Sequence, residues 1–207
     1  MNSMIGNNHV YIGGRLESEP SFSHALYGES FYSTSIAVSR LSGTFDVVPI
    51  TLPERLMGDI MLRIGEYVLI SGQLRSYNRI VDGANRLVVT VFAHSLTPYG
   101  DECIYENEVT LGGYICKQVI FRTTPFSREV ADILLAVNRA YNKSDYLPCI
   151  AWGRNARRAD ELSVGDAVEI KGRLQSREYQ KTGAGGETTT RTTYEVSASQ
   201  ITEVDAF

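Results

Sequence analysis

Tyr146 and Trp152 are the two residues of this chain whose types and spacing most clearly suggest a binding chemistry. They lie six positions apart in residues 146–152, a short apolar and aromatic segment of the kind that forms β-strands. Successive side chains of a strand point to opposite faces, so an even spacing puts both rings on one face. Aromatic faces stack on flat rings such as nucleobases, at ~1 to 3 kcal/mol per base. The pair therefore predicts a stacking platform.

Basic residues fall in the same predicted strands and loops as these rings. Positive charge beside a platform suits nucleic acid, because phosphates need cations, and Arg adds cation–π attraction to a stacked ring. Arg157 and Arg158 are left out, since the solvated side of a helix explains them equally well. A single aromatic residue can also serve strand packing alone. The predicted contact cations are Arg122, Arg139, Lys143, Arg154, Lys171, Arg173, Arg177 and Lys181.

The overall charge does not by itself favour such a partner. The chain has 207 residues and a formal net charge of −4, whereas phosphate contacts need Lys and Arg. Every lysine lies in the second half, at Lys117, Lys143, Lys171 and Lys181. We therefore expect the two halves to have different tasks.

Catalytic signatures are missing from the sequence. It contains no Gly-rich phosphate loop with Lys-Ser/Thr, no His-Glu-x-x-His and no metal-spaced cluster. The histidines, His9, His24 and His94, all lie in the first half, and we interpret them as surface or strand residues. We expect no enzyme, no metal and no cofactor.

The cysteines and the N-terminus indicate the compartment. Cys103, Cys116 and Cys149 are widely spaced and form no Cys-x-x-Cys pair, so we expect free thiols. The opening MNSMIGNNHVYIGG lacks the basic flank and apolar run of a secretory signal. No stretch approaches the ~20 apolar residues that a membrane helix needs. We expect a cytoplasmic, nucleoid-associated protein.

An internal repeat organises the chain. NNHVYIGGRL near the start returns as ENEVTLGGYI, and Val10 and Asp46 are matched by Val109 and Asp145, each 99 positions later. After one inserted residue, ISGQLRS pairs with IKGRLQS at a separation of 100. A domain-sized period indicates a duplication. The predicted domains are residues 1–98 and 107–207, joined by a linker at 98–106.

The second copy predicts five strands with one short helix between the third and the fourth. The strands are expected at residues 108–116, 129–138, 146–152, 167–175 and 191–201, and the helix at 154–162. The first copy repeats this order, with its helix at 53–62 and Pro53 in the first turn. This is the order of an OB fold, a small barrel whose exposed face commonly binds oligonucleotides. The predicted fold class is all-β, two tandem OB-fold barrels.

The second copy resembles the bacterial single-stranded DNA-binding protein (SSB) family along almost its whole length. NEVTLGGYI resembles the opening strand of the family, and Arg122-Thr123-Thr124-Pro125 its R-Y-T-P turn. LAVNR, VGDAVEIKGRLQSREY and YEVSASQI resemble later strands. The first copy is a fainter version, clearest in GEYVLISGQLRSY.

The resemblance implies site residues and a difference between the copies. Base-stacking positions of the family are matched by Tyr141, Tyr146, Trp152 and Tyr179, and the first copy has Ser42, Val47, Pro53 and Arg79 there. We therefore expect the first copy to be structural or dimerising, with weak or no DNA binding. Residues 180–191, rich in Gly and Thr, are expected to form a flexible finger that folds over bound DNA.

The resemblance also implies sequence-nonspecific single-stranded DNA binding in replication, recombination or repair, by a homodimer that presents four OB folds. The acidic end, Glu203 to Phe207, resembles the tail with which the family recruits replication and repair proteins, without the flexible segment that precedes it. Two alternatives stay open. One is a primosome-like or mobile-element accessory protein that acts through protein contacts, and the other is RNA as the ligand.

Overall fold

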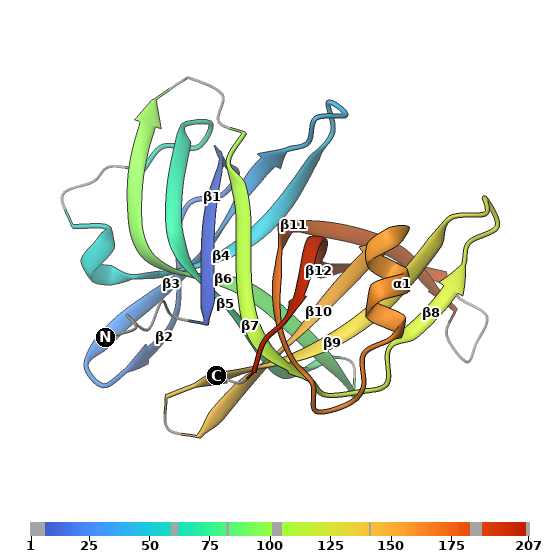
Figure 1. Ribbon diagram of the computed structural model, residues 1–207. Helices are drawn as coiled ribbons and strands as arrows, with labels where there is room; N and C mark the ends of the chain where they lie inside the picture. The colour runs from blue at the N-terminus through green and yellow to red at the C-terminus, as the bar shows by residue number, and fades with distance from the viewer. Residues whose placement is uncertain are drawn as a thin grey trace.

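Strands make up nearly all of the regular structure of this protein (Figure 1). The computed structural model describes residues 7–58, 62–81, 83–100, 105–140, 142–182 and 188–205. The elements are β1 (Asn8–Leu16), β2 (Ser21–Leu26), β3 (Glu29–Ser39), β4 (Phe45–Pro53), η1 (Glu54–Leu56), β5 (Tyr67–Val81), β6 (Ala84–Gly100), β7 (Asn107–Ile115), β8 (Ile120–Thr123), β9 (Glu129–Arg139), β10 (Lys143–Trp152), α1 (Arg154–Asp160), β11 (Ala167–Thr182) and β12 (Thr188–Glu203). No helix in the described part is long and apolar enough to cross a membrane.

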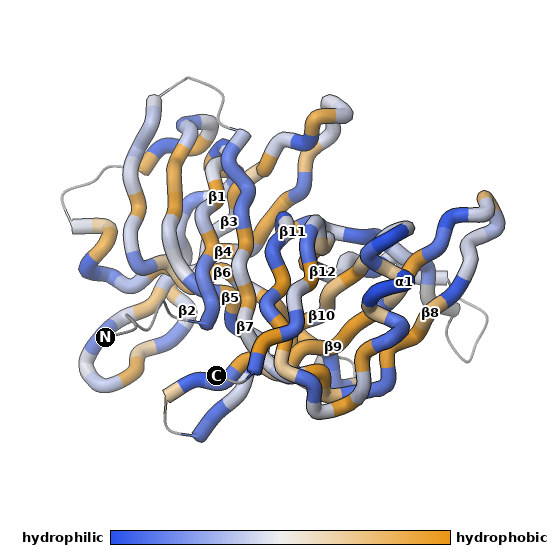
Figure 2. The backbone as a smooth tube through the Cα atoms, in the orientation of Figure 1, coloured by the Kyte–Doolittle hydropathy of each residue, from blue (hydrophilic) through white to orange (hydrophobic). Residues whose placement is uncertain are grey.

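Alternating side chains give each strand one buried face. On β9, for example, Ile133, Leu135 and Val137 are buried, while the residues between them are more exposed. Figure 2 shows the same alternation as orange and blue segments that follow one another along the strands. Most buried apolar side chains of both copies belong to one hydrophobic cluster. Burial of apolar surface on this scale is the main stabilising contribution to such a fold.

Each copy closes into a five-stranded barrel, as predicted. The strand order is β2-β3-β4-β6-β5-β1-β7-β11-β12-β10-β9-β8, and additional β3–β1 and β7–β9 pairings close the two halves. The first barrel therefore runs β1-β3-β4-β6-β5, and the second runs β7-β9-β10-β12-β11. The β4–β6 and β10–β12 pairs are parallel, and every other pair is antiparallel. The prediction of two tandem OB-fold barrels is confirmed.

A short sixth strand in each copy was not predicted from the sequence. Among the described residues, β2 pairs only with β3 and β8 only with β9, outside the closed barrels. All six side chains of β2 are exposed, so it lacks the alternation by which strands are recognised. In the second copy the sequence indicated a turn at residues 122–125, but Arg122 and Thr123 still belong to β8.

The two predicted helices differ in the structure. The helix predicted at 154–162 is confirmed as α1, and its Ala156 and Ala159 are buried against the barrel. In the first copy only η1, one turn of 3-10 helix, is described, and it buries no residue. Pro53 ends β4 and precedes this turn instead of lying in it. Gly58 follows with a φ of 34°, outside the right-handed helical range, and residues 59–61 lie outside the described part.

The barrels are joined through their first strands. β1 and β7 pair antiparallel, with Val10 opposite Val109, which are partners in the sequence repeat. Figure 1 shows this pair in the middle of the molecule, with one barrel on each side. Because repeat partners face each other, the two copies are related by an approximate two-fold axis at this point. The predicted linker overlaps β6, which continues to Gly100, and residues 101–104 lie outside the described part.

Two buried aspartates fasten one barrel to the other. Asp46 of the first copy accepts hydrogen bonds of 2.7 Å from both the backbone N–H and the hydroxyl of Ser176 in the second copy. Asp145 of the second copy accepts one of 2.7 Å from the backbone N–H of Ser76 in the first copy. Both carboxylates are almost fully buried. These reciprocal contacts, which we call the aspartate clasp, fix the orientation of the barrels.

Candidate nucleic-acid interface

Tyr146 and Trp152 lie on the outer face of β10. This strand pairs with β9 without interruption from Lys143 to Trp152, so its alternation is regular. Leu147, Cys149 and Ala151 point into the barrel and are buried. Tyr146 is 49% exposed and Trp152 41%, which leaves ring surface of both free for contact. The regular register therefore supports the predicted platform on one strand.

Tyr179 lies on a long hairpin that extends beyond the barrel. The pairing of β11 with β7 ends at Gly172, and from there β11 pairs only with β12. Tyr179 faces Arg191 across this ribbon and is 42% exposed. The predicted finger at 180–191 is thus partly a continuation of β11 and β12, while residues 183–187 lie outside the described part. Tyr141 and the side chain of Lys181 also lie outside it.

The outward face of β11 carries a row of cations that leads toward Tyr179. Lys171, Arg173, Arg177 and Tyr179 are spaced by even numbers, and all four are exposed. The intervening Leu174 is buried in the barrel. The strand thus presents basic and aromatic side chains to the same side.

Neighbouring carboxylates neutralise part of the predicted positive charge. Ion pairs join Arg122 to Asp132 at 3.0 Å, Arg139 to Asp145 at 3.5 Å, Lys171 to Glu169 at 3.3 Å and Arg177 to Glu195 at 3.3 Å. Within the part of the chain that the structure describes, Lys143, Arg154 and Arg173 are exposed and have no side-chain ion pair or hydrogen bond. The pairs of Arg122 and Lys171 are exposed, contribute little and exchange easily, so these two cations stay available to phosphates. Arg139 and Arg177 are paired with buried carboxylates, which hold them more firmly.

A hollow beside Trp152 contains a cation that the sequence interpretation missed. It has a volume of about 540 Å³ and is lined by Trp152, Gly153, Arg128 and Arg157, with parts of the β8–β9 turn. Arg128 is exposed. Its backbone N–H and carbonyl are both hydrogen-bonded to Thr124, and among the described residues its side chain has no hydrogen bond or ion pair. Arg157, set aside as part of a solvated helix face, pairs with Glu129 at the edge of this hollow. Arg128 lies three positions after the predicted turn at 122–125, and that position was the only signal for it.

The first barrel presents a different surface at the equivalent places. Tyr146 lies opposite Ala136 in the second copy, and Val47 lies opposite Ala37 in the first. Trp152 corresponds in the same way to Pro53, which is buried. Ser42 and Arg79 are exposed and offer no ring. The strand register therefore supports the alignment of the copies and the loss of the platform in the first.

Several aromatic residues of the first barrel pack on one another instead. Phe31 lies 5.7 Å from Phe92 and 4.9 Å from His24, centroid to centroid, and Phe92 lies 5.9 Å from His94. Arg75 lies over the ring of Phe92 at 6.0 Å. Burial, helped by the nearby positive charge of Arg75, lowers the pKa of His94 below its ordinary value. These rings connect the β2–β3 hairpin with β6. In the described residues, no group of three or more His, Cys, Asp or Glu could hold a metal ion.

Residues 106–204 match the model of the single-strand binding protein family. The second half of this chain belongs to that family. This range covers β7 to β12, and with them Tyr146, Trp152 and Tyr179. The recognition made from the sequence is therefore confirmed.

Relatives support this placement. Single-stranded DNA-binding protein 1 of Staphylococcus aureus is 37% identical over 81 residues, which cover 36% of this chain and 48% of that protein. The single-stranded DNA-binding protein of Deinococcus radiodurans is 26% identical over 202 residues, which cover 82% of this chain and 67% of that protein. The chain spans about half the length of most of these curated relatives. Their names describe DNA-binding proteins and no catalytic activity.

Among solved structures, a deletion mutant of the single-stranded DNA binding protein from Thermus aquaticus is similar over both barrels. The match covers 98% of this chain and 97% of that one, with a TM-score of 0.73 and 25% identity. The single-strand binding family fold thus extends through the first half as well.

Proposed function

We propose that this protein binds single-stranded DNA without sequence preference and protects it during replication, recombination or repair. The observation that carries the proposal is the pair Tyr146 and Trp152, half-exposed on the outer face of β10 in the copy that belongs to the single-strand binding family. Stacking is tolerant of sequence because every base has a flat face. Cations along β11 and around Trp152 supply phosphate contacts, which release counterions and make the affinity fall with salt.

We propose a division of labour between residues 1–98 and 107–207. The second domain would carry the platform of Tyr141, Tyr146, Trp152 and Tyr179, and the first would serve mainly to complete the double barrel. The replacement of Tyr146 and Trp152 by Val47 and Pro53 at equivalent register supports this division. Two such chains would present four barrels as a homodimer, and contacts with replication or repair proteins would follow from the family role. The terminal Phe207 lies outside the described residues.

The proposal is tested by titrating the whole protein with a dT oligomer at two salt concentrations. Trp152 is the single tryptophan, so its fluorescence reports directly on the platform. Wild-type protein should show quenching that weakens with added salt, and Trp152→Ala should lose ~1 to 3 kcal/mol of binding free energy when followed by anisotropy of a labelled oligomer. Competition with poly-U against poly-dT separates DNA from RNA preference.

Leu41→Ala is a matched control, since Leu41 is 92% exposed and lies in the first barrel. It should bind as wild type does. An unchanged affinity in Trp152→Ala would remove that ring from the site. Absence of binding by the wild-type protein would disprove the proposed function.

A further inference from the structure

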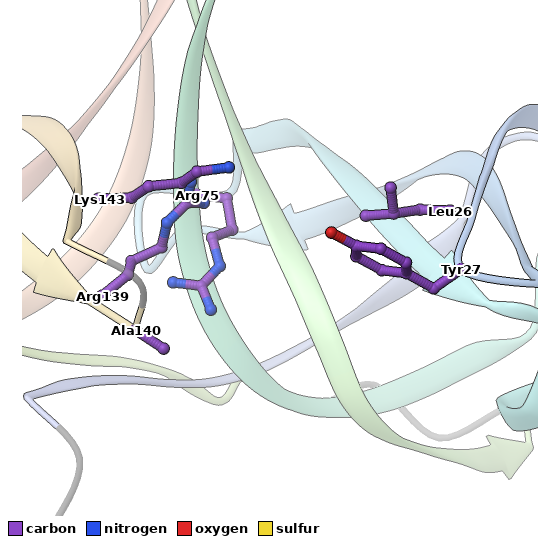
Figure 3. Close-up of a pocket in the computed structure, with 6 residues that line it drawn as sticks. All are labelled: Leu26, Tyr27, Arg75, Arg139, Ala140 and Lys143. Carbon is purple, nitrogen blue, oxygen red and sulfur yellow. The ribbon is translucent and has the colours of Figure 1, made fainter.

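A cleft between the two barrels combines side chains from both copies. It has a volume of about 620 Å³ and is lined by Leu26, Tyr27, Arg75, Arg139, Ala140 and Lys143. The first three belong to the first copy and the last three to the second. Figure 3 shows Tyr27 and Leu26 on one side of the opening, with Arg75, Arg139 and Lys143 on the other. We call it the interdomain cleft.

Positive charge is in excess in this cleft. Asp145 is the carboxylate in contact with its cations, and it is shared between Arg75, at 3.1 Å, and Arg139, at 3.5 Å. Lys143 is exposed and adds a third positive charge without an ion pair of its own among the described residues. Three cations against one buried carboxylate leave the cleft with a net positive charge, which attracts phosphates.

The walls of the cleft are held in place before any ligand arrives. Arg75 lies over Phe92 and donates hydrogen bonds to Asp145 and Gln73. Phe92 contacts Phe31 of β3, whose hairpin with β2 carries Tyr27 at its tip. The hairpin that carries Tyr27 is therefore positioned through the same packed aromatic residues as Arg75.

Tyr27 is fully exposed at the tip of this hairpin. With Gly28 it forms a two-residue turn, and its φ of 50° lies in the left-handed region that Gly and Asn adopt more easily. A tyrosine at this position gains nothing from burial. It does present a whole aromatic face toward a cationic cleft, an arrangement that suits a base and its phosphate.

The equivalent place on the other side of the two-fold axis carries less positive charge. Lys143 corresponds to Thr44 in the repeat, and Arg75 corresponds to Gln175. Arg40, the counterpart of Arg139, is engaged with Asp46 and with the backbone carbonyl of Ser176. A smaller cavity of about 180 Å³ lies beside Arg40. That cavity is also lined by Arg173, so two cations face one carboxylate there, Asp46. The interdomain cleft, with three cations and one carboxylate, has the larger excess of positive charge.

The interdomain cleft lies beside the strand that carries the platform of the second barrel, since Lys143 and Tyr146 both belong to β10. Tyr146 directly follows Asp145, and its backbone N–H donates to the hydroxyl of Ser76, the neighbour of Arg75. A nucleic-acid strand that stacks on Tyr146 would meet Lys143 and Arg75 next.

We propose that the interdomain cleft binds the phosphodiester backbone of a single strand as it leaves the second barrel, with a base stacked on Tyr27. The first barrel then contributes Tyr27 and Arg75 directly to binding, although neither residue lies at a position that matches a base-stacking residue of the family. This inference rests on the proposed function.

The test compares two lengths of dT oligomer, about 8 and about 30 nucleotides, because one OB fold covers roughly 4 to 16. The short oligomer is followed by quenching of Trp152, and the long one by anisotropy. Tyr27→Ala should bind the long oligomer about fivefold or more weakly and the short one normally, since a stacked base is lost only where the strand reaches the cleft. Arg75→Gln and Lys143→Thr copy the residues of the related cleft. Each should lower the slope of log affinity against log salt by about 0.7 with the long oligomer.

Leu41→Ala, a change at the smaller cavity, is the control and should leave the binding of both oligomers unaffected. Arg75 is paired with a buried carboxylate, so its replacement can also loosen the barrels. Tyr27 is fully exposed and its variant is free of that effect. The inference is overturned if Tyr27→Ala binds the long oligomer as wild type does while Trp152→Ala is weakened. An equal loss with both lengths also overturns it. Failure of the wild-type protein to bind either oligomer would instead overturn the proposed function.

Discussion

The two barrels of this chain keep the same framework and differ in what they expose. Both copies retain the buried aspartate, the serine that it contacts in the other copy, and the order of strands. They differ at the outer face of the third barrel strand, where Tyr146 and Trp152 of the second copy correspond to Val47 and Pro53. Residues that hold the barrels together are thus shared, while those suited to contact a ligand are not. Framework and binding surface can therefore be altered separately.

The largest expected effect is a loss of stability, and it tests whether close backbone packing constrains both barrels equally. A Cβ at Gly72 would lie 2.3 Å from the carbonyl oxygen of Phe92, and one at Gly172 would lie 2.2 Å from that of Ser197. Backbone must move in either case, so Gly72→Ala and Gly172→Ala should each cost about 3 kcal/mol of unfolding free energy. Urea denaturation of both variants measures this. Gly43→Ala is the control. A Cβ at Gly43 would meet open space, so only its φ of 82°, which is unfavourable for alanine, should cost stability there. A loss confined to one of the two barrel variants would show that the barrels do not share this constraint.

The second prediction concerns the aspartate clasp and its dependence on pH. Burial by itself would raise the pKa of Asp46, but hydrogen bonds from Arg40 and Ser176 outweigh it and hold the pKa below the ordinary value. A depressed pKa in the folded state means that the carboxylate stabilises the fold above its unfolded pKa, and that this contribution disappears as pH falls through the folded pKa. Asp46→Asn should cost about 2 kcal/mol at neutral pH and progressively less below about pH 4.

Denaturation curves between about pH 2 and 7 test this. Glu17→Gln is the control, because Glu17 forms an exposed pair with Arg15 and should change stability by less than about 0.5 kcal/mol. A cost for Asp46→Asn that stays constant down to the lowest pH would contradict the role of the charge.

The smallest effect is expected from exchanging ligand-facing residues between the copies. Tyr146→Ala should weaken binding of a dT oligomer by about 1 kcal/mol, at the lower end of the range for a stacked base, because half of the ring is covered. Val47→Ala, its counterpart, should change nothing. Val47 is 40% exposed, so Val47→Tyr can place a ring on the first barrel, with a gain of at most about 1 kcal/mol. Equal losses in Tyr146→Ala and Val47→Ala would abolish the distinction between the barrels.

Much of the fold could be predicted because it depends on local patterns. Alternation along residues 129–138 and 167–175 indicated β9 and β11, and the repeat indicated two barrels. Prediction failed for β2, whose side chains are all exposed and therefore show no alternation. It also overestimated the helix at 53–62, where the described residues form only the short turn η1. In α1, by contrast, Ala156 and Ala159 pack on the barrel and stabilise the helix.

The candidate site was predicted in part. Tyr146, Trp152 and Tyr179 are exposed as the motif positions suggested. The ion pairs of Arg122 and Arg177 were not foreseen, since Asp132 and Glu195 reach them only across paired strands. Arg128 was missed because nothing in the sequence brings it near Trp152, 24 positions later.

The sequence by itself determined the strand pattern, the duplication and the unequal distribution of aromatic residues. These features depend only on residue type and spacing, and alternation requires only the geometry of a single strand. The tertiary structure alone decided that Tyr27 and Arg75 of the first barrel line one cleft with Arg139 and Lys143 of the second. That meeting depends on the β1–β7 ladder and the aspartate clasp, which set the angle between two barrels. A local pattern cannot encode it, because β1 and β7, and each aspartate and the serine that it contacts, lie far apart in the sequence.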